Sequence, residues 1–332
     1  MRDGLTALAG LLIVALAAAL IGPAFVDWRD WRTDIDRGLA AALGVPVRSE
    51  GHVSLRLLPQ PRLYLEGISL ADGEPSHARI ERLTLALAAP PLLKGEIQVT
   101  RAIAEGILVT LGYDPQGRFI LPRLSEAALT RDTAFDRVIL RGGKLRLAPA
   151  AGGAPHDIGP ISAEMSALRL AGPWKIDAEA ARIPLRISTG AYEPATGLAL
   201  KIASNTQERR IAIEGAIGLE RAGDALTASF AGSGTLALKG EEADAAAPVT
   251  LAVKGGLADG RLTAASLSLD LEGVGRLEGE GGWDIVGAGR AEARLAARRL
   301  DADALLPLAG VLKSLVSATG GLGLPPFEGT LA

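Results

Sequence analysis

The sequence predicts a mainly β protein behind an N-terminal transmembrane helix. The first observation is a run of 23 residues, Gly4 to Val26, that carries no charge and one hydroxyl, that of Thr6. The second is an alternation of apolar and polar residues from Val47 onward, which is the period of a strand with one apolar face. The third is the presence of 41 glycines and 19 prolines, which favours short strands joined by tight turns.

The apolar run is long enough to be a membrane anchor, because 23 helical residues reach about 35 Å. A secretory signal is the alternative, with Ala17–Ala19 as a small-residue cleavage site, but its apolar region usually has only about 7 to 15 residues. Here the run continues past those alanines, and Trp28 and Trp31 follow at the depth where indole rings favour the headgroup layer. We therefore predict an uncleaved anchor over residues 1–26.

Charge says little about which side of the membrane the body occupies. Arg29, Arg32 and Arg37 follow the anchor, whereas Arg2 is offset by Asp3, and this count weakly favours a cytoplasmic body. The rule has little force for large domains, and the body has about 300 residues. The side is therefore left open by charge alone.

Composition excludes several classes of function. The 35 basic residues are balanced by 38 acidic ones, so there is no positive surplus to neutralise a nucleic acid backbone. The chain has no cysteine, which excludes disulfides, thiolate nucleophiles and cysteine-ligated metals. Nucleic acid is not an expected partner, and the redox compartment stays open.

A helix is predicted over residues 27–45. Apolar residues recur there at intervals of three and four, and Gly44 and Pro46 end the pattern. This amphipathic helix either caps the following domain or lies on the membrane surface. Its apolar stripe consists of Trp28, Trp31, Ile35, Leu39, Ala42 and Leu43.

Strands are predicted over residues 46–300, with at least ten candidates. The parity of the apolar positions slips across Gly67, which indicates a bulge. After residue 300, Asp301–Thr319 has the period of a helix, and residues 320–332 resemble the start of a further strand. Beyond the first strands, the alternating runs are Ile107–Leu111, Val138–Leu147, Ile183–Ile187, Leu198–Ile202, Ile211–Ile217, Leu251–Val253 and Leu267–Leu271.

No catalytic constellation is present, so we predict no enzyme activity, no cofactor and no metal site. Gly142-Gly143-Lys144 lacks the preceding glycine of a phosphate loop, and Gly287-Ala288-Gly289 lacks the third glycine of a dinucleotide fold. Asp301 and Asp303 are better explained by an acidic helix start than by a cation site. None of the three histidines has a second histidine at the spacing of metal ligands. They are His52, His77 and His156.

Alternation alone does not separate two folds. It fits a β-sandwich, in which the leucines of two sheets interdigitate in a filled core, and it also fits one curled sheet with an open apolar face. Soluble antiparallel sheets commonly bury one face, so the pattern by itself favours the sandwich.

Three segments follow the anchor in a distinctive order: PAFVDWRDWRTDIDRGLAAALGVPV at Pro23–Val47, GHVSLRLLPQPRLYLEGISL at Gly51–Leu70 and IERLTLALAAPPLLKGEIQV at Ile80–Val99. This order resembles the amino-terminal region of the AsmA family. Weaker similarity to the family is found at Leu170–Trp174 and Arg299–Asp303.

The sequence departs from the family pattern in two places. Gly117–Ile120 stands where an Asn-Trp pair usually ends a glycine turn. The sequence ends at Phe327–Ala332, as if at the opening of a strand, whereas AsmA-family proteins are usually longer. This suggests the first part of a longer protein.

The resemblance implies a protein of the Gram-negative inner membrane whose body lies in the periplasm and supports outer-membrane homeostasis. The family is similar to chorein-type bridge-like lipid transfer proteins, which implies an elongated, curled antiparallel sheet, a β-groove, that conducts phospholipid or another acyl-chain lipid. A protein partner in the periplasm or outer membrane is a further expectation. The alternative function is an assembly scaffold for outer-membrane proteins, with a filled β-core and no lipid cargo.

Lipid contacts are then expected from the apolar face of the first strands, while Arg56 and Thr84 point the other way by alternation. The predicted lipid-binding residues are Val53, Leu55, Leu57, Leu63, Leu65, Leu83, Leu85, Leu87, Ile107, Val109 and Leu111.

Overall fold

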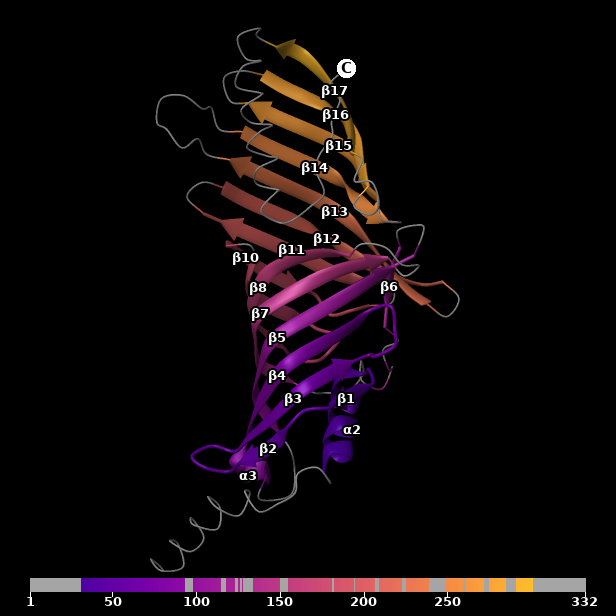
Figure 1. Cartoon of the computed structure of the whole chain (residues 1–332). Coiled ribbons are helices and arrows are strands. Elements are labelled where there is room, and N and C mark those ends of the chain that lie inside the picture. Colours follow the sequence, from indigo (N-terminus) through magenta and orange to yellow (C-terminus); the bar gives the residue numbers. More distant parts are fainter. Residues whose placement is uncertain are drawn as a thin grey trace, which may run out of the picture.

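The described part of the chain forms one large sheet with a helix at its N-terminal end (Figure 1). The computed structural model describes residues 31–92, 98–114, 118–122, 125, 127, 134–149, 155–180, 182–193, 195–206, 209–222, 225–238, 249–258, 261–271, 275–284 and 291–300. The predicted anchor over 1–26, the predicted helix over 301–319 and the start of a strand over 320–332 lie outside these residues. Of the helices described, none is long and apolar enough to cross a membrane.

The helices are α2 (Arg32–Leu43) and the short α3 (Ala89–Leu92). The alternating runs predicted beyond the first strands all lie within strands, whereas the three-residue β6 was not predicted, and alanine, glycine and serine hide the alternation of β8, β13, β16 and β17. β9 was not predicted either, because alanine occupies two of its four apolar positions. The strands are β1 (Val47–Ser49), β2 (Val53–Arg56), β3 (Arg62–Leu70), β4 (His77–Leu87), β5 (Val99–Tyr113), β6 (Phe119–Leu121), β7 (Phe135–Pro149), β8 (His156–Ala167), β9 (Trp174–Ala180), β10 (Ile183–Thr189), β11 (Leu198–Asn205), β12 (Arg209–Ala222), β13 (Ala225–Leu238), β14 (Val249–Ala258), β15 (Arg261–Leu271), β16 (Gly275–Asp284) and β17 (Ala291–Leu300).

The strands follow one another across the sheet almost in chain order. One edge of β3 pairs with both β1 and β2, and its other edge pairs with β4, which pairs with β5. From β7 to β17 every strand pairs antiparallel with the next. The sheet is antiparallel, as predicted, except at one junction, where β7 begins again at the same end as β5 and the two are parallel.

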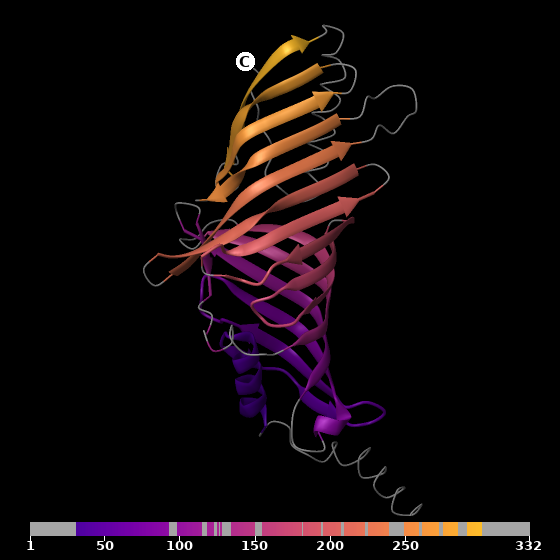
Figure 2. The ribbon, with the colours of Figure 1, turned by 180° about the vertical axis from the view of Figure 1, so that it is seen from behind.

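The sheet curls until it meets itself. The short strand β6 pairs with the end of β5 on one edge and with the start of β13 on the other. Hydrogen-bonded neighbours therefore form a closed path through β5, β7 to β13 and β6, while β14–β17 continue beyond it as an open sheet (Figures 1 and 2). The curled sheet is confirmed, and the alternative of two separate sheets packed as a sandwich is not what the described strands form.

A line of kinks keeps the apolar side chains on one face. Three glycines have positive φ values, which residues other than glycine rarely adopt. They are Gly67 on β3 (+62°), Gly106 on β5 (+65°) and Gly142 on β7 (+63°). Across Gly67 the buried positions change from Leu65 to Ile68, which shifts the parity by one. The bulge predicted at Gly67 is confirmed.

Helix α2 covers the first strands. Ile35 and Leu39 pack against a buried cluster on β2–β5, and the Asp36 carboxylate accepts hydrogen bonds from the Ser49 backbone N–H at 3.1 Å and the Ser49 hydroxyl at 2.7 Å. The helix ends where the sequence predicted, at Gly44, whose φ of 73° and N–H bond to the Ala40 carbonyl terminate it. The packing supports the interpretation of α2 as a cap on the domain.

Candidate functional site

The most extensive feature of the molecule is the apolar face of the sheet. We define its central row as the chain of directly paired residues that starts at Leu55 and ends at Leu295. Every member is apolar, and with about 4.8 Å between neighbouring strands the row is roughly 65 Å long. The central row comprises Leu55, Leu63, Leu85, Ala102, Val138, Met165, Ile176, Ile187, Ile202, Ile213, Gly234, Val253, Leu267, Gly279 and Leu295.

The other face of the same strands is charged. Arg186 on β10 pairs with Asp177 on β9 at 3.3 Å, and Lys201 on β11 pairs with Glu214 on β12 at 3.2 Å. These residues alternate along the chain with members of the central row, so their charges lie on the opposite face of the sheet. Charge on one face leaves the aliphatic face as the one that must avoid water.

Further ion pairs on the charged face are well formed. The Arg146 guanidinium donates from two nitrogens to the two Asp157 carboxylate oxygens, each at 2.7 Å. These hydrogen bonds lower the pKa of Asp157 and raise that of Arg146. Glu164 raises the pKa of Arg137 in the same way, through a hydrogen bond. The Asp157 and Glu164 carboxylates each pair with an arginine, as is typical of a solvated sheet face.

The apolar face has two zones that differ in how far they are buried, a filled zone and a half-exposed zone. On β2–β5 it is packed under α2 as a filled core. From Ala102 onward every member of the central row is only half-buried. On β9 half-buried apolar residues alternate strictly with exposed charged ones, and on β10 half-buried and exposed positions alternate in the same way. Buried positions also occur on the later strands, including Ala163 on β8 and the directly paired Leu269 and Leu277 on β15 and β16.

The filled zone contains six of the eleven predicted lipid-binding residues. Val53, Leu63, Leu65, Leu83, Leu85 and Leu87 are 1% to 8% exposed in the buried cluster. Leu55 and Ile107 lie half-buried against that cluster, Leu57 and Leu111 are half-buried, and Val109 is 36% exposed. Lipid contact at these residues stays a prediction.

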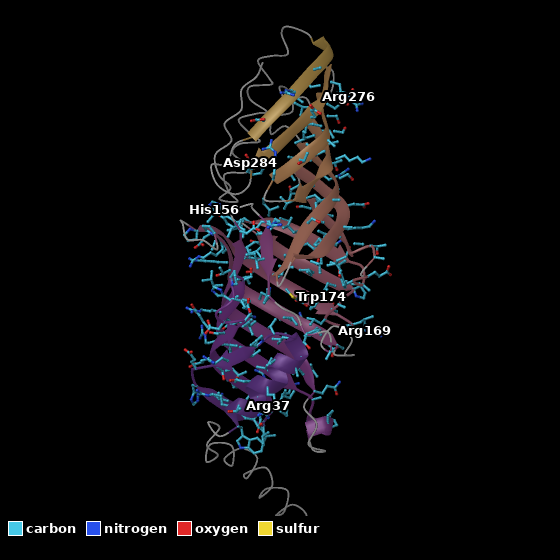
Figure 3. The ribbon with its side chains drawn as sticks, turned by 90° about the vertical axis from the view of Figure 1, so that its right-hand side faces the viewer. Arg37, His156, Arg169, Trp174, Arg276 and Asp284 are labelled. Atoms are coloured by element: carbon cyan, nitrogen blue, oxygen red, sulfur yellow. The ribbon has the colours of Figure 1, made fainter. Side chains whose placement is uncertain are left out.

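The half-exposed zone was not singled out from the sequence. Its residues belong to runs that were recognised only as strands, including Ile187 on β10, Ile202 on β11 and Ile213 on β12. The signal that marks them is alternation without a neighbouring amphipathic helix to cover the apolar side. Figure 3 shows the two ends of this arrangement, with Arg37 of α2 at one end of the molecule and Arg276 of β16 toward the other.

The apolar face carries few polar groups. On β8–β11 its one titratable side chain at a described position is His156 at the start of β8, which is paired directly with Leu147 and whose Nε2 has no hydrogen-bond partner. The Ser204 hydroxyl on β11 and the Trp283 indole N–H on β16 have no hydrogen-bond partner there. Within the described ranges no three His, Asp or Glu side chains gather as metal ligands.

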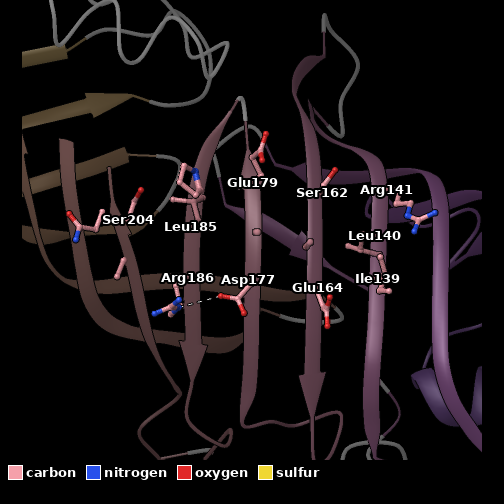
Figure 4. A pocket seen from close by; sticks show the side chains of 15 residues that line it. Ile139, Leu140, Arg141, Ser162, Glu164, Asp177, Glu179, Leu185, Arg186 and Ser204 are labelled. Atoms are coloured by element: carbon pink, nitrogen blue, oxygen red, sulfur yellow. Dashed lines mark hydrogen bonds and ion pairs between the residues drawn. The ribbon is translucent and has the colours of Figure 1, made fainter. Parts of the chain in front are cut away.

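A hollow of about 660 Å³ crosses the middle of β7–β11 (Figure 4). Each of these strands contributes three consecutive residues to it, so residues of both faces line it. The Arg186–Asp177 ion pair lies among them, as do Leu140, Leu185 and Ser204. Its polar lining also includes Ser162 on β8, which is paired directly with Glu179 on β9.

Comparison with known proteins agrees with the geometry. The sequence profile of the AsmA family matches residues 2–170, which is half of the chain. The comparisons with curated proteins and with solved structures gave no match. The matched residues include α2, the filled zone and the parallel junction of β5 and β7. The chain belongs to the AsmA family.

Proposed function

We propose that this protein conducts the acyl chains of phospholipid or a similar lipid along the apolar face of its curled sheet, and so supports outer-membrane homeostasis. The observation that carries the proposal is the central row, which is apolar on every strand it crosses and half-exposed from β5 to β17. Membership of the AsmA family supports a role in the cell envelope.

The energetics explain why a lipid needs such a face. Exposure of an acyl chain to water costs about 0.8 kcal/mol per methylene, so two long chains carry a penalty on the order of 20 kcal/mol. A short apolar pocket offsets only part of this. A continuous row about 65 Å long covers a whole chain and also lets it slide without leaving apolar contact.

The same proposal includes the setting. Residues 1–26 anchor the chain in the inner membrane, α2 follows at the membrane end, and the sheet extends into the periplasm. In this arrangement the protein acts as a carrier without catalytic residues, cofactor or metal.

One observation favours a second function. The core under α2 is filled by side chains, as an assembly scaffold for outer-membrane proteins requires. The scaffold explains the first strands well, but it gives no reason for the half-exposed aliphatic residues from β7 onward. A protein partner that covered that zone would replace the lipid.

Mass spectrometry of lipids retained by the purified full chain tests the proposal. We expect copurified phospholipid with wild-type protein and less with Ile187→Glu, because a carboxylate on the central row opposes acyl chains. The matched control is Ser188→Glu, which adds the same charge to the other face of β10. Wild-type protein free of lipid, with a bound envelope protein in its place, would favour the scaffold.

A further inference from the structure

The closed part of the sheet raises a problem for a lipid with a charged head. Nine strands form the closed path, namely β5, β7–β13 and β6. In a closed sheet of about eight strands the interior is filled by side chains or holds one small ligand. Acyl chains fit such a space only if the headgroup stays outside it.

The chemistry of the interior leads to the same conclusion. On β8–β11 the apolar face offers no Lys or Arg side chain to accompany a phosphate, and its one titratable group is His156 at the start of β8. An ionised group that enters such a face unpaired loses its hydration without compensation. A lipid that moves along the central row must therefore keep its headgroup in water, and the closed path blocks that route at β6.

The closure is narrow. β12 pairs with β13 along its whole length, from Arg209 to Ala222. In contrast, β6 is only three residues long, Phe119–Leu121, and it is the strand that joins β5 to β13. Release of β6 turns the closed path into a groove at a small loss of main-chain pairing, namely three residue pairs on the β13 edge or two on the β5 edge.

The β5 edge of β6 carries side-chain hydrogen bonds in addition to main-chain pairing. On the β5 edge, the Ser76 hydroxyl donates to the Ile120 carbonyl and accepts from the Gly112 N–H at 2.8 Å. The connection from β5 to β6 is tied as well, because the Asp114 carboxylate accepts from the Arg118 N–H at 2.9 Å and from its guanidinium at 2.7 Å. The other edge is formed by main-chain pairing with Leu226–Ala228.

We propose that β6 is a releasable clasp, which stays on β5 and separates from β13 to open a lateral slot for the headgroup of a phospholipid. The proposal rests on the proposed function. It assigns the cargo to lipids with a charged head outside the sheet and acyl chains inside it.

A disulfide lock tests the clasp, because the chain has no cysteine of its own. Phe119→Cys with Ala228→Cys links β6 to β13, whereas Phe119→Cys with Tyr113→Cys links β6 to β5. Both variants lose the same phenylalanine, and each reduced form is the folding control for its own oxidised form. The measurement is transfer of fluorescent phosphatidylglycerol by the full chain between phosphatidylglycerol–phosphatidylethanolamine vesicles.

We expect oxidation to abolish transfer in the β6–β13 lock and a reductant to restore it, while the β6–β5 lock transfers lipid in both states. Equal transfer by the oxidised and reduced β6–β13 lock would overturn the clasp and leave the conduit intact. Wild-type protein that neither retains nor transfers lipid would overturn the proposed function, and the clasp with it.

Discussion

At the scale of single residues, the position of an aliphatic side chain on the central row decides what it does. Leu85 and Ile187 are both members of the central row, yet Leu85 is buried in the core that α2 covers and Ile187 is only half-buried. The same residue type therefore stabilises the fold at one end and offers an apolar surface at the other.

This contrast predicts opposite outcomes for one substitution at two sites. Leu85→Glu should lower the free energy of unfolding by several kcal/mol, because it places a charge in a packed core. Ile187→Glu should lower it by less than Leu85→Glu does, because the Ile187 side chain is only half-buried and already partly meets water. Urea denaturation of both variants checks this, and an equal loss of stability would contradict the two-zone description of the face.

A second prediction at this scale concerns Asp157, whose pKa is held below its ordinary value by the Arg146 hydrogen bonds. Arg146→Gln should return the pKa of Asp157 to its usual range, as seen by NMR titration of the carboxyl carbon. A depressed folded-state pKa adds stability above the unfolded pKa, and this is lost as pH falls through the folded pKa. The wild type should therefore lose a small increment of stability on acidification that the variant lacks, and an unchanged Asp157 pKa would contradict this pairing.

At the scale of elements, the line of kinks shows how much the sequence reveals. The slip at Gly67 was predictable, because the change in parity and the glycine that permits it lie within one strand. The role of α2 as a cap was one of two predicted alternatives. Sequence could not show that Ile35 and Leu39 of α2 would pack against the buried cluster of β2–β5, since that depends on how the helix is placed against the sheet.

The kink gives a prediction with an internal control. Gly67→Ala should destabilise the protein by roughly 1 to 2 kcal/mol, because the left-handed backbone penalises a Cβ. Gly38→Ala in α2 should stabilise it by up to about 1 kcal/mol, since no atom lies within 4 Å of the added methyl. Thermal unfolding of the two variants should shift in opposite directions, and a neutral Gly67→Ala would show that the kink does not require glycine.

At the scale of the whole molecule, the closure through β6 is what sequence did not reveal. The strand has only three residues, so no alternation is visible in it, and its partner Leu226–Ala228 lies about one hundred residues away in the chain. The apolar face follows from local alternation that each strand displays alone. A long-range pairing between a short strand and a distant edge has no such local signature.

The central claim is that one continuous apolar face carries lipid from the closed part of the sheet to its open end. Site-specific photo-crosslinking in cells tests it most directly, with the probe placed at Ile202 in the closed part and at Val253 on the open strand β14. Matched probes at Lys201 and Lys254 occupy the opposite face of the same strands. The account predicts lipid adducts at both central-row positions and none at the lysines, whereas adducts at neither row position, or equally at all four, would contradict it.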